Sequence, residues 1–238
     1  MIGGPEATEP PVLGFAVEGV EALRAAAVPT LAFMVRIDAG GRAVSAIGLE
    51  TRLQIRAERR RYGAAESERL GELFGAPDDF SRSLGTVPWA ETTQHVGPFE
   101  GERLVELRVP CTYDFEVAAA KYLAALEDGH VPVELLFSGN VLWRGADGRL
   151  QTAMIPWDRE APGRMPVAVW RQALAAAFGD AAWLRVDRDV FARLQAERSR
   201  RRLTTWEDTF EALLGEADDR RAQGPAPQSA HRPQGDDA

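Results

Sequence analysis

The clearest pattern in the chain is an alternation of apolar and polar positions over residues 43–57. One side of the alternation holds Ile47, Leu49, Thr51, Leu53, Ile55 and Ala57, and the other holds Gly48, Glu50, Arg52, Gln54, Arg56 and Glu58. Successive side chains of a strand point to opposite faces of a sheet. The run therefore predicts a long strand with one buried and one solvated face, which is typical of an antiparallel sheet.

Shorter patterns predict further strands at 12–20, 31–37, 86–96, 102–110 and 150–155, and a long apolar run predicts a strand at 131–143. Residues 38–42 (Asp-Ala-Gly-Gly-Arg) form a short, glycine-rich connection, which predicts a hairpin between the strands at 31–37 and 43–57. Gly139 interrupts the apolar strand at 131–143 and indicates a β-bulge there.

Helical spacing appears at 64–75 and 114–128, and it dominates after Trp157. Pro166 suits the first position of one helix, Asp187 or Asp189 can cap a second, and Thr204-x-x-Glu207 is a capping box for a third. Strands come first and helices last. The order predicts an α+β protein, a largely antiparallel β-sheet or sandwich followed by a C-terminal helical segment.

Three regions follow from composition. Residues 1–11 are rich in proline and glycine and are expected to form a flexible arm. Residues 12–214 are expected to form a single globular domain, mainly β with two short helices over 12–160 and mainly helical over 161–214. Residues 215–238 hold no Val, Ile, Leu, Met or aromatic residue, and such a segment is expected to be a disordered tail.

The acidic charge balance argues against a nucleic-acid-binding protein. The chain has 28 Lys and Arg against 36 Asp and Glu, a formal net charge of −8. A nucleic-acid protein gains affinity from positive surface, so a nucleic-acid partner is not expected. No apolar run approaches the roughly 20 residues of a membrane span, and the N-terminus lacks the pattern of a secretory signal. We therefore expect no membrane insertion and a cytoplasmic location.

Few residues of the sequence are candidates for a catalytic or metal-binding site. The motifs for phosphate-binding loops, dinucleotide folds, serine hydrolases and zinc proteases are missing, and one cysteine with three histidines is too few to predict a metal site or a cofactor. Cys111 is the one candidate nucleophile, with His95 or His130 as its base and Asp114 to orient the base. The simpler interpretation of Cys111 is a small buried residue where a strand meets a helix.

Two arginine clusters are candidates for partner binding. The first holds Arg56, Arg59, Arg60 and Arg61, and the second holds Arg198, Arg200, Arg201 and Arg202. Each cluster is either a patch for an acidic partner or the solvated end of an element, paired with nearby carboxylates. Trp157 lies in a loop-like stretch, where it is either an interface anchor or a plug between sheet and helices.

Five segments together resemble an uncharacterised bacterial family of unknown function. They are Leu53–Tyr62, Pro110–Tyr122, Leu136–Gly139, Ile155–Trp157 and Pro166–Trp170, and the resemblance extends over residues 12–214. Members of that family are often encoded beside genes for uptake NiFe hydrogenases. The resemblance therefore implies an accessory or assembly role for a hydrogenase, and it implies no catalytic residue.

The leading hypothesis is a non-catalytic cytoplasmic interaction protein whose partner is a protein, such as a hydrogenase subunit or maturation factor. One alternative is a small cysteine-dependent hydrolase or transferase. Another is a chaperone-like protein that holds unfolded or precursor chains, which loosely fits the order of sheet before helices.

Overall fold

The computed structural model describes residues 9–24, 26–111, 117–179 and 186–222. Contacts between Cα atoms divide the chain into two units, Met1–Trp183 and Leu184–Ala238, which we call the sandwich unit and the helical unit. The sequence pattern predicts one domain over 12–214. The division after Trp183 instead separates the last two helices from the rest.

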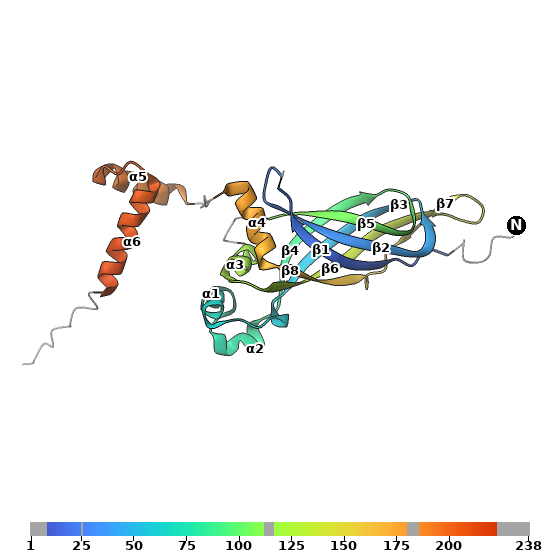
Figure 1. Ribbon diagram of the computed structural model, residues 1–238, viewed down its shortest axis with the longest axis horizontal. Helices are drawn as coiled ribbons and strands as arrows, with labels where there is room; N and C mark the ends of the chain where they lie inside the picture. Colours follow the sequence, from blue (N-terminus) through green and yellow to red (C-terminus); the bar gives the residue numbers. More distant parts are fainter. Residues whose placement is uncertain (1–8, 25, 112–116, 180–185, 223–238) are drawn as a thin grey trace, which may run out of the picture. The chain divides into compact units, whose positions relative to one another are not determined.

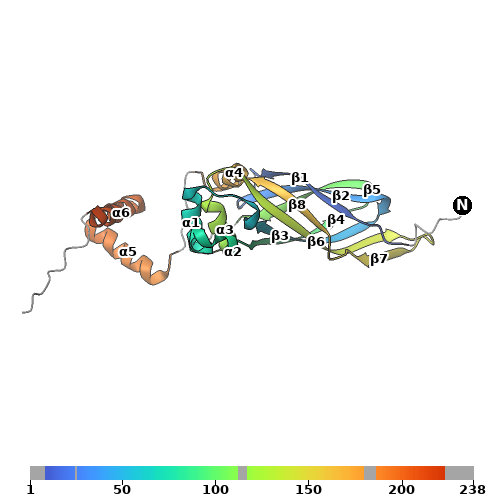
Figure 2. The ribbon, with the colours of Figure 1, turned by 90° about the horizontal axis from the view of Figure 1, so that it is seen from below.

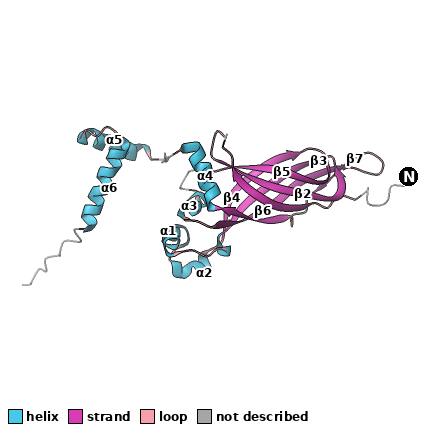
Figure 3. Cartoon of the chain, in the orientation of Figure 1, coloured by secondary structure: helices cyan, strands magenta, loops and turns pink. Residues whose placement is uncertain are grey.

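The sandwich unit contains two antiparallel sheets (Figures 1 and 3), which confirms the predicted α+β class. The first sheet has the order β1-β2-β5, with bounds Gly14–Ala22, Thr30–Val44 and Phe99–Pro110. The second has the order β4-β3-β6-β7, with bounds Thr86–Val96, Ala46–Arg56, His130–Arg144 and Leu150–Met154. Strand β8 (Glu160–Pro166) also pairs with β6, along the half of β6 that β7 leaves free.

Four helices of the sandwich unit gather at one end of the strands in both views (Figures 1 and 2). They are α1 (Ala64–Phe74), α2 (Phe80–Ser83), α3 (Ala118–Ala125) and α4 (Val167–Phe178). Short 3-10 turns cover Ala57–Arg59 and Pro77–Asp79. Pro166 directly precedes α4 as its N-cap, one position before the place that the sequence predicts for it.

The predicted hairpin at residues 38–42 is wrong. Strand β2 continues through Gly40 and Gly41 to Val44, and its pairing with β5 shifts register between Asp38 and Ala43. After Ser45 the chain enters β3, which pairs with β4 and β6 and so belongs to the other sheet. Both glycines have positive φ, so they bend the strand where it passes between sheets instead of closing a turn.

The predicted bulge at Gly139 is also wrong, because β3 and β6 pair without a register shift from Ala46 to Ile55. Gly139 has a φ of 119°, and a Cβ there would lie 2.0 Å from the carbonyl oxygen of Gly48. Glycine is therefore required at this position for the close approach of two backbones.

The core lies between the sheets. Phe15 of β1 stacks on Phe137 of β6, with ring centroids 4.1 Å apart. Phe33 of β2 meets Trp89 of β4 edge to face at 5.9 Å. Each pair joins a residue of one sheet to a residue of the other, so apolar burial holds the two layers together.

The helical unit contains α5 (Arg188–Arg201) and α6 (Trp206–Ala222). The Asp187 carboxylate accepts hydrogen bonds from the N–H groups of Asp189 and Val190, as a capping residue does. The predicted capping box at Thr204 is displaced by one residue, because the Thr205 hydroxyl accepts the hydrogen bond from Asp208 N–H.

The predicted tail is wrong for residues 215–222, because α6 continues to Ala222. This stretch has little to bury, but Glu, Ala and Arg favour helix, and side chains one turn apart pair, as Arg221 does with Asp218. Residues 223–238 and the arm before residue 9 lie outside the described residues. No helix in the described part of the chain is both long and apolar enough to cross a membrane.

Candidate interaction surface

Trp157 lies on a tight turn between β7 and β8 that is fixed to β6 at both ends. The N–H of Ile155 donates to the carbonyl of Gly139, and the carbonyl of Arg159 accepts from the N–H of Phe137. The turn closes with a hydrogen bond from Arg159 N–H to the Pro156 carbonyl. Trp157 is 92% exposed. It is therefore held in solvent by a short, hydrogen-bonded loop, and the alternative of a plug between sheet and helices is wrong.

A shallow depression of about 350 Å³ adjoins Trp157 on the outer face of the second sheet. Seven charged or hydroxyl residues line it, and the five at alternating positions on the outer face are Glu50 and Arg52 of β3, Glu91 and Thr93 of β4, and Ser138 of β6. Arg52 and Glu91 form an ion pair at 2.6 Å, and the Ser138 hydroxyl donates to Glu50 at 3.5 Å. We call Trp157 and these five side chains the Trp157 surface.

The Trp157 surface combines a large rigid aromatic ring with hydrogen-bonding groups of both charges. Tryptophan and arginine are enriched among the residues that dominate protein–protein binding energy. A loop whose backbone is already ordered before binding loses little conformational entropy when a partner arrives. The arrangement can therefore bind a surface that offers an apolar pocket ringed by polar groups.

Two arginines of the first cluster surround a buried carboxylate, Glu134 of β6. Glu134 accepts hydrogen bonds from Gln54 at 2.7 Å and from Arg56 at 2.5 Å, and Arg59 lies 3.6 Å away. Burial raises the pKa of Glu134, but the hydrogen bonds from Gln54 and Arg56 outweigh burial and leave the pKa below its ordinary value. Arg56 is thus engaged within the fold, while Arg59 remains half exposed.

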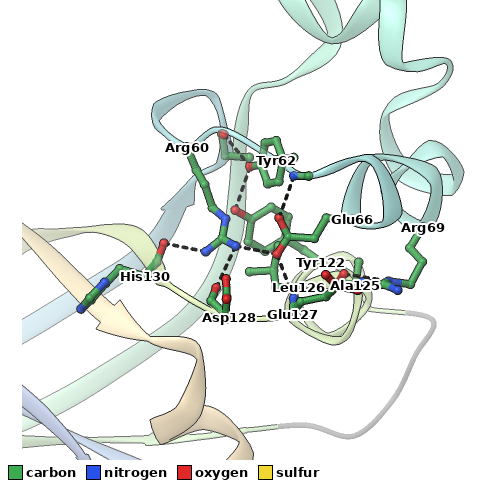
Figure 4. Close-up of polar contacts among 12 residues, drawn as sticks. Arg60, Tyr62, Glu66, Arg69, Tyr122, Ala125, Leu126, Glu127, Asp128 and His130 are labelled. Carbon is green, nitrogen blue, oxygen red and sulfur yellow. Dashed lines mark hydrogen bonds and ion pairs between the residues drawn. The ribbon is translucent and has the colours of Figure 1, made fainter.

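Arg60 is almost fully buried at the helical end of the sandwich (Figure 4), with 9% of its side chain exposed. Its guanidinium donates to the carbonyls of His130 and Asp128 at 2.9 and 2.8 Å, and to the Glu66 carboxylate at 2.6 Å. Glu66 also accepts from the N–H of Glu127 at 2.8 Å. The pair therefore links α1 to the turn that follows α3.

The pKa of Glu66 reflects these contacts. Burial raises it, but the backbone N–H groups of Glu127 and Gly63 and the charge of Arg60 together lower it below its ordinary value. Glu66 therefore stays ionised beside Arg60 at neutral pH, as a buried ion pair in which the carboxylate also accepts from two backbone N–H groups.

Neighbouring groups complete this end of the unit. The Tyr62 hydroxyl donates to the carbonyl of Ala57 at 2.6 Å and lies 2.9 Å from the Tyr122 hydroxyl. Arg69 donates to the carbonyl of Ala125 at the end of α3, where helices leave carbonyls unpaired. Arg60 and Arg69 thus have structural roles. Arg61 is exposed, so partner binding by Arg59 and Arg61 stays a prediction.

The second cluster lies on α5 and in the residue after it. Arg198 lies over the ring of Trp206, 4.4 Å from its centroid. Arg200 and Arg201 both form ion pairs with Glu197, and Arg201 also reaches Glu216 of α6 at 2.5 Å. Arg202 caps the helix in a left-handed conformation. Arg198 and Arg201 thus join α5 to α6, and partner binding by the four arginines stays a prediction.

The candidate nucleophile does not have the surroundings that would activate it. Cys111 is buried, and its thiol lies 3.9 Å from the carbonyl of Val109. Burial raises the pKa of the thiol to about 12, so it is protonated at neutral pH. Nucleophilic cysteines have the opposite shift.

The candidate bases for Cys111, His95 and His130, lie near the ends of two strands. His95 is an exposed residue of β4, next to the connection into β5, and Cys111 follows the far end of β5. The 12 residues of β5 span roughly 40 Å. His130 is exposed at the start of β6, and Asp114 lies outside the described residues. Within the described ranges, no group of three or more His, Cys, Asp or Glu side chains is arranged to hold a metal ion.

Sequence reasoning missed the two buried carboxylates, Glu66 and Glu134. Glu134 carried a usable signal, since it is a lone acid in the apolar run Val131–Phe137. A charge in a buried strand needs a partner, and the arginines after β3 were available. Glu66 had a weaker signal, because an acidic residue in the first turn of a helix is common on the surface.

The sequence matches a family model described as "Family of unknown function (DUF6084)" over residues 10–222, so the chain belongs to that family. The match confirms the predicted resemblance to a family of unknown function and carries no link to hydrogenases. No curated protein matches the chain.

Two solved structures with some likeness are crystal structures of a β-glucosidase from Kluyveromyces marxianus, one in complex with glucose and one labelled with selenomethionine. They are 10% and 11% identical and have TM-scores of 0.23 and 0.21. The match covers 64% of this chain and spans 15% of the length of theirs. Likeness this distant carries no argument about fold or function.

Proposed function

We propose that the chain is a non-catalytic interaction protein whose sandwich unit binds a protein partner through the Trp157 surface. The observation that carries the proposal is the exposure of Trp157 on a turn whose two ends are hydrogen-bonded to β6. An exposed tryptophan costs solubility and adds nothing to the core of its own unit. Binding a partner gives the side chain the apolar contact that the fold does not.

The surroundings of Trp157 favour a folded protein as that partner. The surface offers acidic, basic and hydroxyl groups within one depression, and Arg52 is already oriented by Glu91. Ordered polar groups around a central aromatic anchor fit the polar rim of a protein interface. A chaperone-like role remains the alternative, and it requires that the surface prefer unfolded over folded chains.

The specific form of the proposal is the accessory role for a NiFe hydrogenase in the cytoplasm that the family resemblance implies. A cysteine-dependent hydrolase or transferase is the less supported alternative, because the Cys111 thiol is buried and protonated. Cell fractionation followed by detection of the chain tests the cytoplasmic location.

The experiment is affinity purification of the tagged full chain from the organism that encodes it, with and without Trp157→Ala. A partner is expected to copurify with the wild type and to be lost with Trp157→Ala, since truncation of an interface anchor costs about 2 kcal/mol or more of binding free energy. The matched control is Met154→Ala, which removes another exposed apolar side chain, 79% exposed, from the neighbouring strand β7. Unfolding by urea should give the same midpoint for all three proteins.

Mass spectrometry of the copurified proteins separates the hypotheses. Hydrogenase subunits or their precursors in the wild-type sample support the specific role. Denatured client chains bound in preference to the folded proteins support the chaperone alternative. Equal capture by the wild type and Trp157→Ala contradicts the proposed surface.

A further inference from the structure

The helical unit buries almost none of its apolar side chains. In residues 186–222, Thr209 is the one buried residue that α5 and α6 contain. The large apolar side chains that remain exposed are Val190, Phe191, Phe210 and Leu214, and Leu214 is 63% exposed. Within residues 186–222 the two helices therefore form one layer, and these residues supply no second layer against its apolar face.

Beside the Arg201–Glu216 ion pair and the Arg198–Trp206 contact, aromatic rings provide apolar contacts inside the unit. Phe191 lies 5.2 Å from Trp206, and Trp206 lies 6.2 Å from Phe210, between ring centroids. Helices of 14 and 17 residues provide little core, and units below about 40 residues usually need oligomerisation, metals or disulfides. The chain's one cysteine lies in the other unit, so no disulfide joins these helices. The described residues contain no group of side chains that could hold a metal ion, which leaves oligomerisation as the source of stability.

The charges of the two helices are opposite. Helix α5 carries five arginines against two acidic residues, and α6 carries six acidic residues against two arginines. A second copy of the unit offers the same apolar face together with the complementary charges. When two copies meet about a two-fold axis, α5 of each can lie against α6 of the other.

We infer that the helical unit is a dimerisation module, in which the apolar faces of two copies pack into a four-helix arrangement with basic α5 against acidic α6. Phe210 and Leu214 lie near the centre of the contact, and exposed charges such as Arg193 and Glu211 lie around it. The inference is independent of the Trp157 surface. A two-fold dimer would then present two copies of that surface to its partners.

Light scattering after size-exclusion chromatography of the full chain tests the inference. The wild type is expected at twice the 26.0 kDa chain mass. Leu214→Asp should shift the protein to monomer, because it places a charge in the apolar contact. Met154→Asp is the matched control in the sandwich unit, at a side chain of similar exposure, and should stay dimeric.

A second variant, the charge reversal Glu211→Arg, tests the dimer if Leu214→Asp unfolds α6. Glu211→Arg preserves helix propensity and removes acidic charge from α6, so the dissociation constant of the dimer should rise by roughly tenfold. Glu68→Arg, at an exposed position of α1, should leave it unchanged. A wild-type monomer at all concentrations, or a dimer that neither Leu214→Asp nor Glu211→Arg weakens, overturns the inference.

Discussion

The two arginine clusters look alike as sequence and have different roles in the structure. Residues 52–61 and 193–202 each contain five arginines and one glutamate. In the sandwich unit Arg60 is buried against Glu66 and backbone carbonyls, and Arg56 covers buried Glu134. In the helical unit Arg200 and Arg201 pair with partly exposed carboxylates on the helix surface.

The difference arises from what lies beside each cluster. Strand β6 pairs with β3 in a register that places Glu134 opposite Gln54, next to Arg56. The chain then turns into α1, which places Glu66 beside Arg60. Helices α5 and α6 form a single layer, and in residues 186–222 their charged side chains are not buried. A run of arginines therefore has a structural role only where the fold places a buried carboxylate beside it. Elsewhere its side chains remain exposed on the surface.

Replacing Arg60 gives the largest expected effect. Arg60→Ala leaves the Glu66 carboxylate buried without its counter-charge and frees the carbonyls of Asp128 and His130. We expect the free energy of unfolding of the sandwich unit to fall by about 3 kcal/mol, measured by urea denaturation followed by tryptophan fluorescence.

Arg61→Ala is the matched control, since it removes the neighbouring and exposed arginine. Its expected effect lies within about 0.5 kcal/mol. Similar losses for Arg60→Ala and Arg61→Ala would break the distinction between the two kinds of arginine.

Most strands were predictable because apolar alternation depends only on which face is buried. Strand β4 has the predicted bounds, and β3 lies within its predicted range. The error at Gly40 and Gly41 has a physical origin. Glycines with positive φ occur both in hairpin turns and where a strand bends from one sheet into another. Only the pairing of β2 with β5 shows that the chain bends between sheets here.

The candidate site was less predictable. The sequence singled out Trp157, but both its burial and its exposure fitted the local pattern, and the choice depends on two hydrogen bonds to β6. Arg60 could not be told from Arg61, because their different roles depend on contacts with Glu66 and Asp128, which are distant in sequence or belong to other elements.

Lowering the pH tests the buried Arg60–Glu66 pair, because it protonates the Glu66 carboxylate. Its pKa in the folded state lies below the ordinary value of 4.5, so its stabilising effect is complete above about pH 4.5 and is lost as the pH falls through the folded-state pKa. Glu66→Gln should destabilise the sandwich unit by about 2 kcal/mol at neutral pH.

The measurement is a series of urea midpoints for the wild type and Glu66→Gln at decreasing pH. The gap between the two proteins should narrow below about pH 4.5, because the wild-type carboxylate becomes protonated and resembles the amide. Glu68→Gln on the exposed side of α1 serves as control. A gap that stays constant down to acid pH would show that Glu66 contributes packing and not charge.

The smallest effect is expected from Arg201→Ala in the helical unit, and its dependence on salt separates the two clusters. Hydrogen bonds to Glu216 and Glu197 raise the pKa of Arg201, yet these ion pairs are partly exposed and therefore screened by salt. Hydrogen exchange of α5 amides in the full chain, at fixed protein concentration, should show slightly faster opening in low salt and no difference from the wild type near 1 M salt. The Arg60→Ala deficit should persist at that salt, since a buried pair is little screened. An Arg201→Ala effect that survives high salt would show that Arg201, like Arg60, forms an ion pair shielded from solvent, and the distinction between the two clusters would fail.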